Sequence, residues 1–153
     1  MTIALSLLIG VVAGLRALTA PAAVSWAARL GRLDLGSSVL AFAGYAYTPW
    51  ILTALAAVEL VTDQLPTTPS RTVPVAFGTR IVMGGLCGAA VSAAPGTAAA
   101  GAIAGIVGAI IGTLGGRAAR GWLAAALGND HPAAIIEDVL ALGGASLIVM
   151  ALA

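Results

Sequence analysis

The chain has 153 residues, of which 60% are hydrophobic and only 8% are charged, and its formal net charge is +1. A soluble domain carries charge on about a quarter of its residues because its surface contacts water. This composition therefore excludes a water-soluble globular protein and predicts an integral membrane protein. The basic residues are all Arg and form no cluster, which argues against nucleic acid as a partner and against a surface that attracts anionic headgroups.

Five hydrophobic segments predict an all-α, polytopic membrane protein with about five transmembrane helices, within a range of four to six. Segments of this length and composition favour helices over a barrel, whose strands would show alternating runs of about ten residues. We expect one transmembrane domain over residues 1–153. Proline and threonine after the second segment, with Pro66 as the expected helix stop, predict a polar loop. Residues 115–132 are interpreted as a basic connector. The segments cover residues 2–28, 47–61, 75–94, 97–114 and 133–152.

Glycine recurs in the fourth segment at steps of four and three residues, which places all the recurring glycines on one helical stripe. Such a stripe lets helix backbones approach closely, and small residues at this spacing drive helix association in lipid. We therefore predict tight helix packing, with a narrow glycine-lined solute path as the alternative. The same spacing recurs in two other segments, at Gly10 and Gly14 and at Gly84 and Gly88. The stripe consists of Gly101, Gly105, Gly108, Gly112 and Gly115.

Two pairs of short matches indicate a possible inverted repeat of residues 1–95 and 96–153. The sequence "GLRA" at 14–17 resembles "GGRA" at 115–118, and "AAVELVTD" at 56–63 resembles "AAIIEDVL" at 133–140. An odd number of spans separates the two copies, so they would have opposite orientations. Inverted repeats recur in transporters, where the binding site lies at the repeat interface.

Six ionisable residues within the hydrophobic segments or next to them are the candidate site. A charge inside the membrane is costly, so each such residue is a functional candidate. Glu59 and Asp63 are four residues apart and share one helical face. The alternatives are carboxylates at wet helix ends and, for Arg80, a side chain that snorkels to the interface. The candidate substrate- or ion-binding residues are Arg16, Glu59, Asp63, Arg80, Glu137 and Asp138.

The depth and direction of these side chains decide whether they form one site. Arg16 is expected to lie deep in the membrane unless its helix breaks at Pro21. We expect Glu59 and Asp63 to form one half of a shared site, with an acid of the last segment in the other half. Glu137 and Asp138 are about 100° apart on a helix, so only one faces such a site, and we favour Glu137. Arg16 and Arg80 would neutralise the acids.

The excess of carboxylates over arginines favours a small cation, a proton or a small solute as the partner of this cluster. We therefore predict a small membrane transporter or channel. The alternatives are a non-transporting scaffold or assembly protein and, more remotely, a membrane-embedded lipid enzyme. One His and one Cys (Cys87) exclude multi-histidine and multi-cysteine metal sites. No catalytic motif is recognised, so we expect no enzyme activity, no metal and no cofactor. Glycine faces on three segments predict a homo-oligomer, most simply a dimer in contact with membrane lipid.

Three stretches, "GLRALTAPAAVSWAARLG", "VELVTDQLPTTPSRTVP" and "IIEDVLAL", resemble a family of small bacterial membrane proteins catalogued as domain of unknown function 4126. The resemblance covers most of the chain in the same order, and the Glu-x-x-x-Asp-x-x-Pro element is its most specific part. It implies a multi-pass helical fold in the bacterial inner membrane, and a family pattern that includes Gly14-Leu15-Arg16 and both acidic elements. The family often has Asp-Lys where this chain has Asp63-Gln64, so any role of that lysine is absent here. The resemblance implies no activity.

Overall fold

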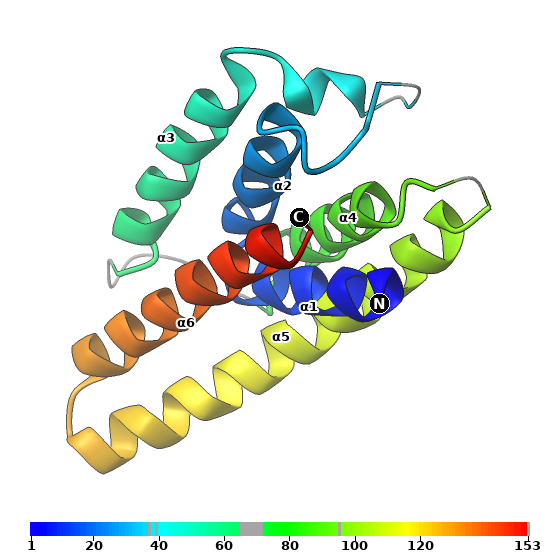
Figure 1. The fold of residues 1–153 in the computed structure, drawn as a ribbon. Coiled ribbons are helices and arrows are strands. Elements are labelled where there is room, and N and C mark those ends of the chain that lie inside the picture. The colour runs from blue at the N-terminus through cyan, green and yellow to red at the C-terminus, as the bar shows by residue number, and fades with distance from the viewer. Residues whose placement is uncertain (37, 39, 65–71, 95, 153) are drawn as a thin grey trace.

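The computed structural model describes residues 1–36, 38, 40–64, 72–94 and 96–152 (Figure 1). Pro66 therefore lies outside the described residues, and α3 ends before it. The described residues form six α-helices and one 3-10 helix. In chain order these are α1 (Thr2–Leu15), α2 (Thr19–Arg29), the 3-10 helix η1 (Ala41–Gly44), α3 (Thr48–Thr62), α4 (Pro74–Val91), α5 (Ala98–Leu127) and α6 (Asp130–Ala151).

Three of these helices, α4, α5 and α6, are long and apolar enough to cross a membrane. Two further apolar helices, α1 and α3, are shorter. The described residues thus confirm the prediction of a helical protein, with helices long and apolar enough to span a membrane. The exact number of spans and the inverted repeat stay predictions.

The first hydrophobic segment is broken into two helices at Arg16. Arg16 has an extended backbone, with φ −139° and ψ 113°, and α2 begins three residues later at Thr19. Pro21 does not cause the break. It lies in the first turn of α2, where a helix needs no amide hydrogen, so proline fits there without cost.

The expected connector over residues 115–132 is wrong, because most of it is helix. α5 continues through "GGRAARGWLAAAL" to Leu127. This stretch has no proline, and its Ala, Arg and Leu residues are strong helix formers that outweigh the glycines. Gly128 ends the helix in the left-handed conformation, with φ 67°, and the Asn129 side chain accepts a hydrogen bond from the His131 amide at 3.1 Å to cap α6.

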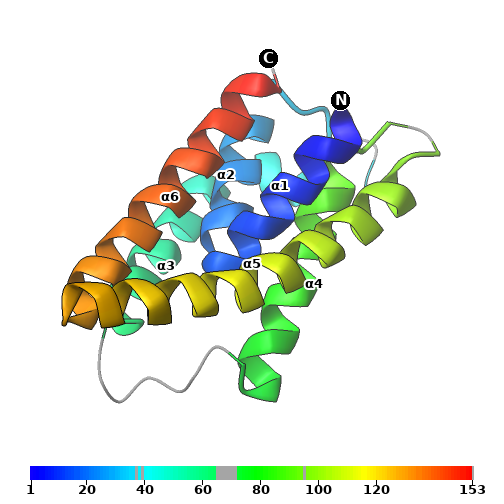
Figure 2. The same cartoon turned by 90° about the horizontal axis from the view of Figure 1, so that it is seen from below.

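α5 packs across α1 and α4, and these two interfaces are the most extensive in the structure (Figure 2). A Cβ atom added at Gly108 would lie 2.9 Å from the Val11 amide nitrogen of α1. One added at Gly88 of α4 would lie 2.9 Å from the Cα of Gly105. Backbones can approach this closely only where the residue at the contact has no side chain, as glycine does. The stripe packs as predicted except at Gly115, where an added Cβ would meet nothing within 4 Å.

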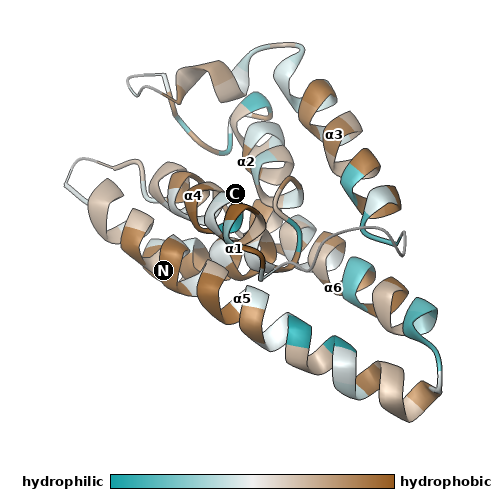
Figure 3. Cartoon of the chain, turned by 180° about the vertical axis from the view of Figure 1, so that it is seen from behind, coloured by the Kyte–Doolittle hydropathy of each residue, from teal (hydrophilic) through white to brown (hydrophobic). Residues whose placement is uncertain are grey.

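The outer face of α5 carries large apolar side chains at helical spacing, opposite the glycine stripe. These exposed residues are Ile103, Val107, Ile111 and Leu114. Small residues thus lie inside and large apolar residues outside, an arrangement that suits a lipid surround and not water. Hydrophilic residues gather at one end of the molecule, where α3 ends and α5 joins α6 (Figure 3).

α3 is the least enclosed helix, and its main contacts are with α2 and η1. Trp26 of α2 and Trp50 of α3 meet edge to face, with ring centroids 5.0 Å apart. The Trp26 indole also donates a hydrogen bond to the Thr53 hydroxyl at 3.0 Å. Most of the other surface of α3 is open, including the side chains of Ile51, Leu55 and Val58.

Candidate functional site

Arg16, at the break between α1 and α2, is the centre of a cluster of charged side chains. Its exposed fraction is 0%. Its guanidinium forms ion pairs with Asp63, which follows α3, and with Asp138 of α6. Nε also donates to Oδ1 of Asp138 at 2.8 Å. A buried arginine needs such partners because an unpaired charge inside a protein is costly.

Glu59 caps the start of α2. Its two carboxylate oxygens accept hydrogen bonds from the amides of Ala17 and Leu18, at 2.7 and 2.8 Å. These amides have no carbonyl partner one turn earlier because the chain is extended at Arg16. A carboxylate at this position is also favoured by the positive end of the α2 dipole.

Arg80 of α4 closes the end of α1 in the complementary way. Its Nη1 donates to the carbonyl oxygens of Gly14 and Leu15, at 2.9 and 2.6 Å. The hydroxyl of Thr113 on α5 also donates to the Gly14 carbonyl, at 3.1 Å. The Arg80 guanidinium lies 3.6 Å from Oδ2 of Asp63 and so joins the same cluster.

The helix break therefore explains why charged residues lie inside this apolar chain. An interrupted helix leaves amide and carbonyl groups without partners, and these are costly where no water is available. Glu59 satisfies the amides, Arg80 satisfies the carbonyls, and Arg16 at the break itself is paired with carboxylates. Polar groups from α1, α2, α3, α4 and α6 thus meet at one point.

The two acids of α6 have different partners, and our preference for Glu137 is wrong in this respect. Among the described contacts, Asp138 is the acid that pairs with Arg16, and its Oδ2 also accepts a hydrogen bond from Gln64 at 3.3 Å. Glu137 is buried and lies 3.5 Å from Nη1 of Arg120 on α5. Arg120 in turn forms two hydrogen bonds with Asp130, at 2.9 and 2.6 Å.

Sequence reasoning missed Arg120 because the stretch that contains it, residues 115–132, was interpreted as a connector. A hairpin of two helices about Gly128 places Arg120 and Glu137 at nearly the same distance from the turn, eight and nine residues away along the chain. Those nearly equal distances from the turn could have predicted the pairing of Arg120 with Glu137. Gln64 was missed because it was considered only as a departure from a family pattern.

A pocket of about 380 Å³ opens onto the cluster between α3 and α4. Ala17 and Leu18 at the helix break line it, as do Glu59, Asp63 and Arg80. Asp63 is mostly buried, and Glu59 is of intermediate exposure. A small polar solute in this pocket would contact two carboxylates, one guanidinium and the start of α2.

All six candidate residues therefore have defined positions, and five of them surround the helix break. Arg16, Glu59, Asp63, Arg80 and Asp138 contact one another or the ends of α1 and α2. Glu137 takes part in the neighbouring pairing with Arg120. The chain matches no family model, no curated protein and no solved structure, so the family resemblance stays a prediction.

Proposed function

We propose that this chain is a small multi-pass transporter or channel of the bacterial inner membrane, with the charged cluster at the helix break as its binding site. The observation that carries the proposal is the interrupted first segment, whose two ends are closed by Glu59 and Arg80. Many transporters bind their substrates at discontinuous helices, where helix ends and unpaired backbone groups face the site. The adjoining pocket supplies access for a small solute.

A cation or a proton is the solute that suits these residues best. Among the described residues, the Glu59 carboxylate accepts hydrogen bonds from backbone amides and forms no ion pair. Its negative charge is thus balanced mainly by the backbone amides at the start of α2, with a smaller contribution from the Arg80 guanidinium. A cation entering the pocket can bind Glu59 directly and can compete with arginine for Asp63. Competition of this kind allows binding that is strong enough to load and weak enough to release.

A second candidate function is a non-transporting scaffold, which one observation favours. Arg16 is completely buried, and two carboxylates bind its guanidinium. A cluster whose central arginine is paired in this way can hold five helices together without binding a solute. The two functions differ in the effect of removing the Glu59 charge. A transporter needs that charge to bind its solute, whereas a scaffold does not.

The test is ion flux into vesicles that contain the purified protein. Dyes enclosed in the vesicles would report sodium, potassium or protons after a gradient is applied. We expect the wild type to carry at least one of these ions and Glu59→Gln to lose the flux while keeping its helix content. Asp34→Asn is the matched control, because Asp34 is an exposed acid outside the cluster. The Asp34 carboxylate accepts a hydrogen bond from the nearby Gly36 amide.

The outcome separates the two functions. Flux that is lost in Glu59→Gln and kept in Asp34→Asn supports transport through the cluster. Equal flux in the wild type and in Glu59→Gln, or no flux of any of the three ions in the wild type, contradicts the proposal and leaves the scaffold.

A further inference from the structure

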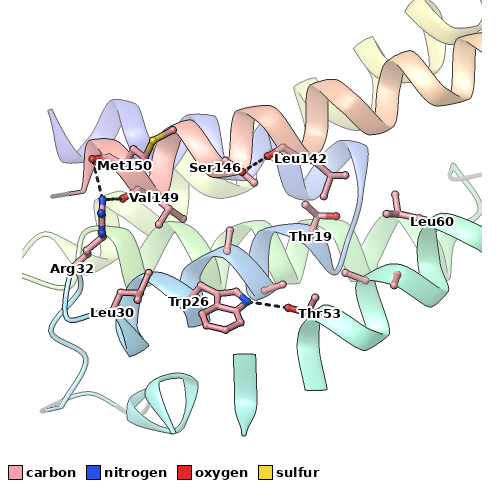
Figure 4. A pocket seen from close by; sticks show the side chains of 15 residues that line it. Thr19, Trp26, Leu30, Arg32, Thr53, Leu60, Leu142, Ser146, Val149 and Met150 are labelled. Atoms are coloured by element: carbon pink, nitrogen blue, oxygen red, sulfur yellow. Dashed lines mark hydrogen bonds between the residues drawn. The ribbon is translucent and has the colours of Figure 1, made fainter. Parts of the chain in front are cut away.

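A second cavity of about 500 Å³ lies on the other side of α2, between α2, α3 and α6 (Figure 4). Its walls are almost entirely apolar. It exists because alanine occupies the positions where the three helices face one another, including Ala23, Ala57 and Ala145. Larger side chains at these positions would fill the space. The charged cluster does not line this groove, so its occupant is a separate question from the proposed transport.

One end of the groove carries a single charged side chain, Arg32, beside the last turn of α6 (Figure 4). Nη1 of Arg32 donates to the carbonyl oxygens of Val149 and Met150, at 3.1 and 3.4 Å. These bonds hold the exposed guanidinium at the mouth of the groove. Its Nε and Nη2 form no hydrogen bond within the described residues, and they remain available to an anionic ligand.

Aromatic residues show the level at which this end of the groove lies in a membrane. Tyr45, Tyr47 and Trp50 are all exposed and lie between η1 and the first turn of α3. Exposed Tyr and Trp residues gather at the level of the lipid headgroups. The end of α2 packs against this region, since Gly44 lies beside Ala28. Arg32, shortly after α2, is therefore at the headgroup level, and the groove extends from there into the hydrocarbon.

The dimensions of the groove match one acyl chain. α2 has 11 residues and is about 16 Å long at 1.5 Å per residue. That is close to half of the ~30 Å hydrocarbon core, which is the depth of one leaflet. Dividing the volume by this length gives a cross-section of roughly 30 Å². A helix about 10 Å in diameter covers roughly 80 Å², so an extended chain matches the width of the groove better than a helix from a second copy does.

We propose that the groove between α2, α3 and α6 binds one acyl chain of an anionic membrane phospholipid, whose phosphate is held by Arg32. Arginine binds phosphate through two parallel N–H groups, and Nε with Nη2 forms such a pair. Apolar walls contact the chain. The guanidinium favours a headgroup with a net negative charge, because the choline cation of a zwitterionic lipid offsets the charge of its phosphate. A single residue at the groove mouth does this, so no basic surface cluster is required.

The test measures the lipid that stays bound after extraction. Protein would be reconstituted in vesicles of equal parts phosphatidylglycerol and phosphatidylcholine, extracted in a mild detergent and weighed by native mass spectrometry. We expect the wild type to retain one phosphatidylglycerol. Ala57→Phe, which fills the groove from an exposed position, should lose it. Ala54→Phe is the control, because Ala54 is exposed on the same helix and does not line the groove.

Headgroup selection is tested by a second pair of variants. Arg32→Gln should reduce the preference for phosphatidylglycerol over phosphatidylcholine about tenfold, since it removes the positive charge that favours the lipid with a net negative headgroup. Arg29→Gln should not, because Arg29 is exposed nearby and does not line the groove. Retained lipid without headgroup preference in the wild type, or unchanged retention in Ala57→Phe, overturns the proposal. A dimer that Ala57→Phe dissociates assigns the groove to a second copy and overturns it too.

Discussion

Substituting Gly105 by alanine tests the close approach of α4 and α5. A Cβ added there would lie 2.9 Å from the carbonyl carbon of Gly84 and 3.1 Å from the Cα of Gly88, and still closer to the Gly84 carbonyl oxygen. All three are backbone atoms, which cannot rotate away as the end of a side chain can. The two helices must therefore separate to admit one methyl group.

The expected cost follows from two opposing effects. Overpacking a closely packed interior costs about 1–3 kcal/mol, and a backbone clash belongs at the upper end of that range. Replacing glycine by alanine inside a helix returns about 1 kcal/mol. We therefore expect Gly105→Ala to lower the free energy of unfolding by about 2 kcal/mol. Gly115→Ala, where an added Cβ meets nothing, should raise it by up to about 1 kcal/mol.

The comparison would be made by unfolding both variants and the wild type in detergent, with helix content followed by circular dichroism. Both changes add the same methyl group to the same helix and to the same predicted stripe, so their difference isolates the contact with α4. Equal stability of Gly105→Ala and Gly115→Ala would refute the close packing of α4 on α5.

Two further outcomes follow from the structure, and a third follows from the sequence. Arg16→Gln should destabilise the protein by about 3–5 kcal/mol in the same unfolding assay, because it removes the guanidinium that pairs with Asp138 and leaves Asp63 with only the more distant Arg80. A loss under 1 kcal/mol would mean that water reaches the cluster. Asp138→Asn should destabilise more than Glu137→Gln, since Asp138 pairs with the buried Arg16 and Glu137 lies 3.5 Å from Arg120; the reverse order would contradict these pairings. Chemical crosslinking in native membranes should capture a dimer, and capture of monomer alone would count against the homo-oligomer.

Composition and glycine spacing were enough to predict the helical membrane fold and most of the packing stripe. Large apolar residues outside and glycine inside follow from the lipid surround. Gly115 was included wrongly, because spacing cannot tell where a neighbouring helix ends. The helix at residues 116–127 was missed because two adjacent glycines and two arginines resemble a loop, although the stretch contains no proline.

The charged residues of the candidate site were also recognisable, because intramembrane charges are few in this chain. The sequence did not reveal which of these residues pair with one another. Glu137 and Asp138 differ by only about 100° on a helix, and the choice depends on how α6 rotates against α5 and α1. The position of the break was equally hidden, since Pro21 is a stronger local signal than Arg16. Only the capping of both helix ends by Glu59 and Arg80 explains why the chain opens at Arg16.

Access to the helix break from the two sides of the membrane tests the central claim most directly, because it requires no knowledge of the solute. Ala17 lines the pocket at the break, and Ala17→Cys in a Cys87→Ser background would be labelled with a membrane-impermeant thiol reagent in sealed vesicles. Asp34→Cys, in an exposed loop, would report the orientation of the protein. In vesicles where Asp34→Cys reacts from one side only, a transporter or channel should let Ala17→Cys react from both sides. Reaction of Ala17→Cys from a single side under every ionic condition would contradict the claim.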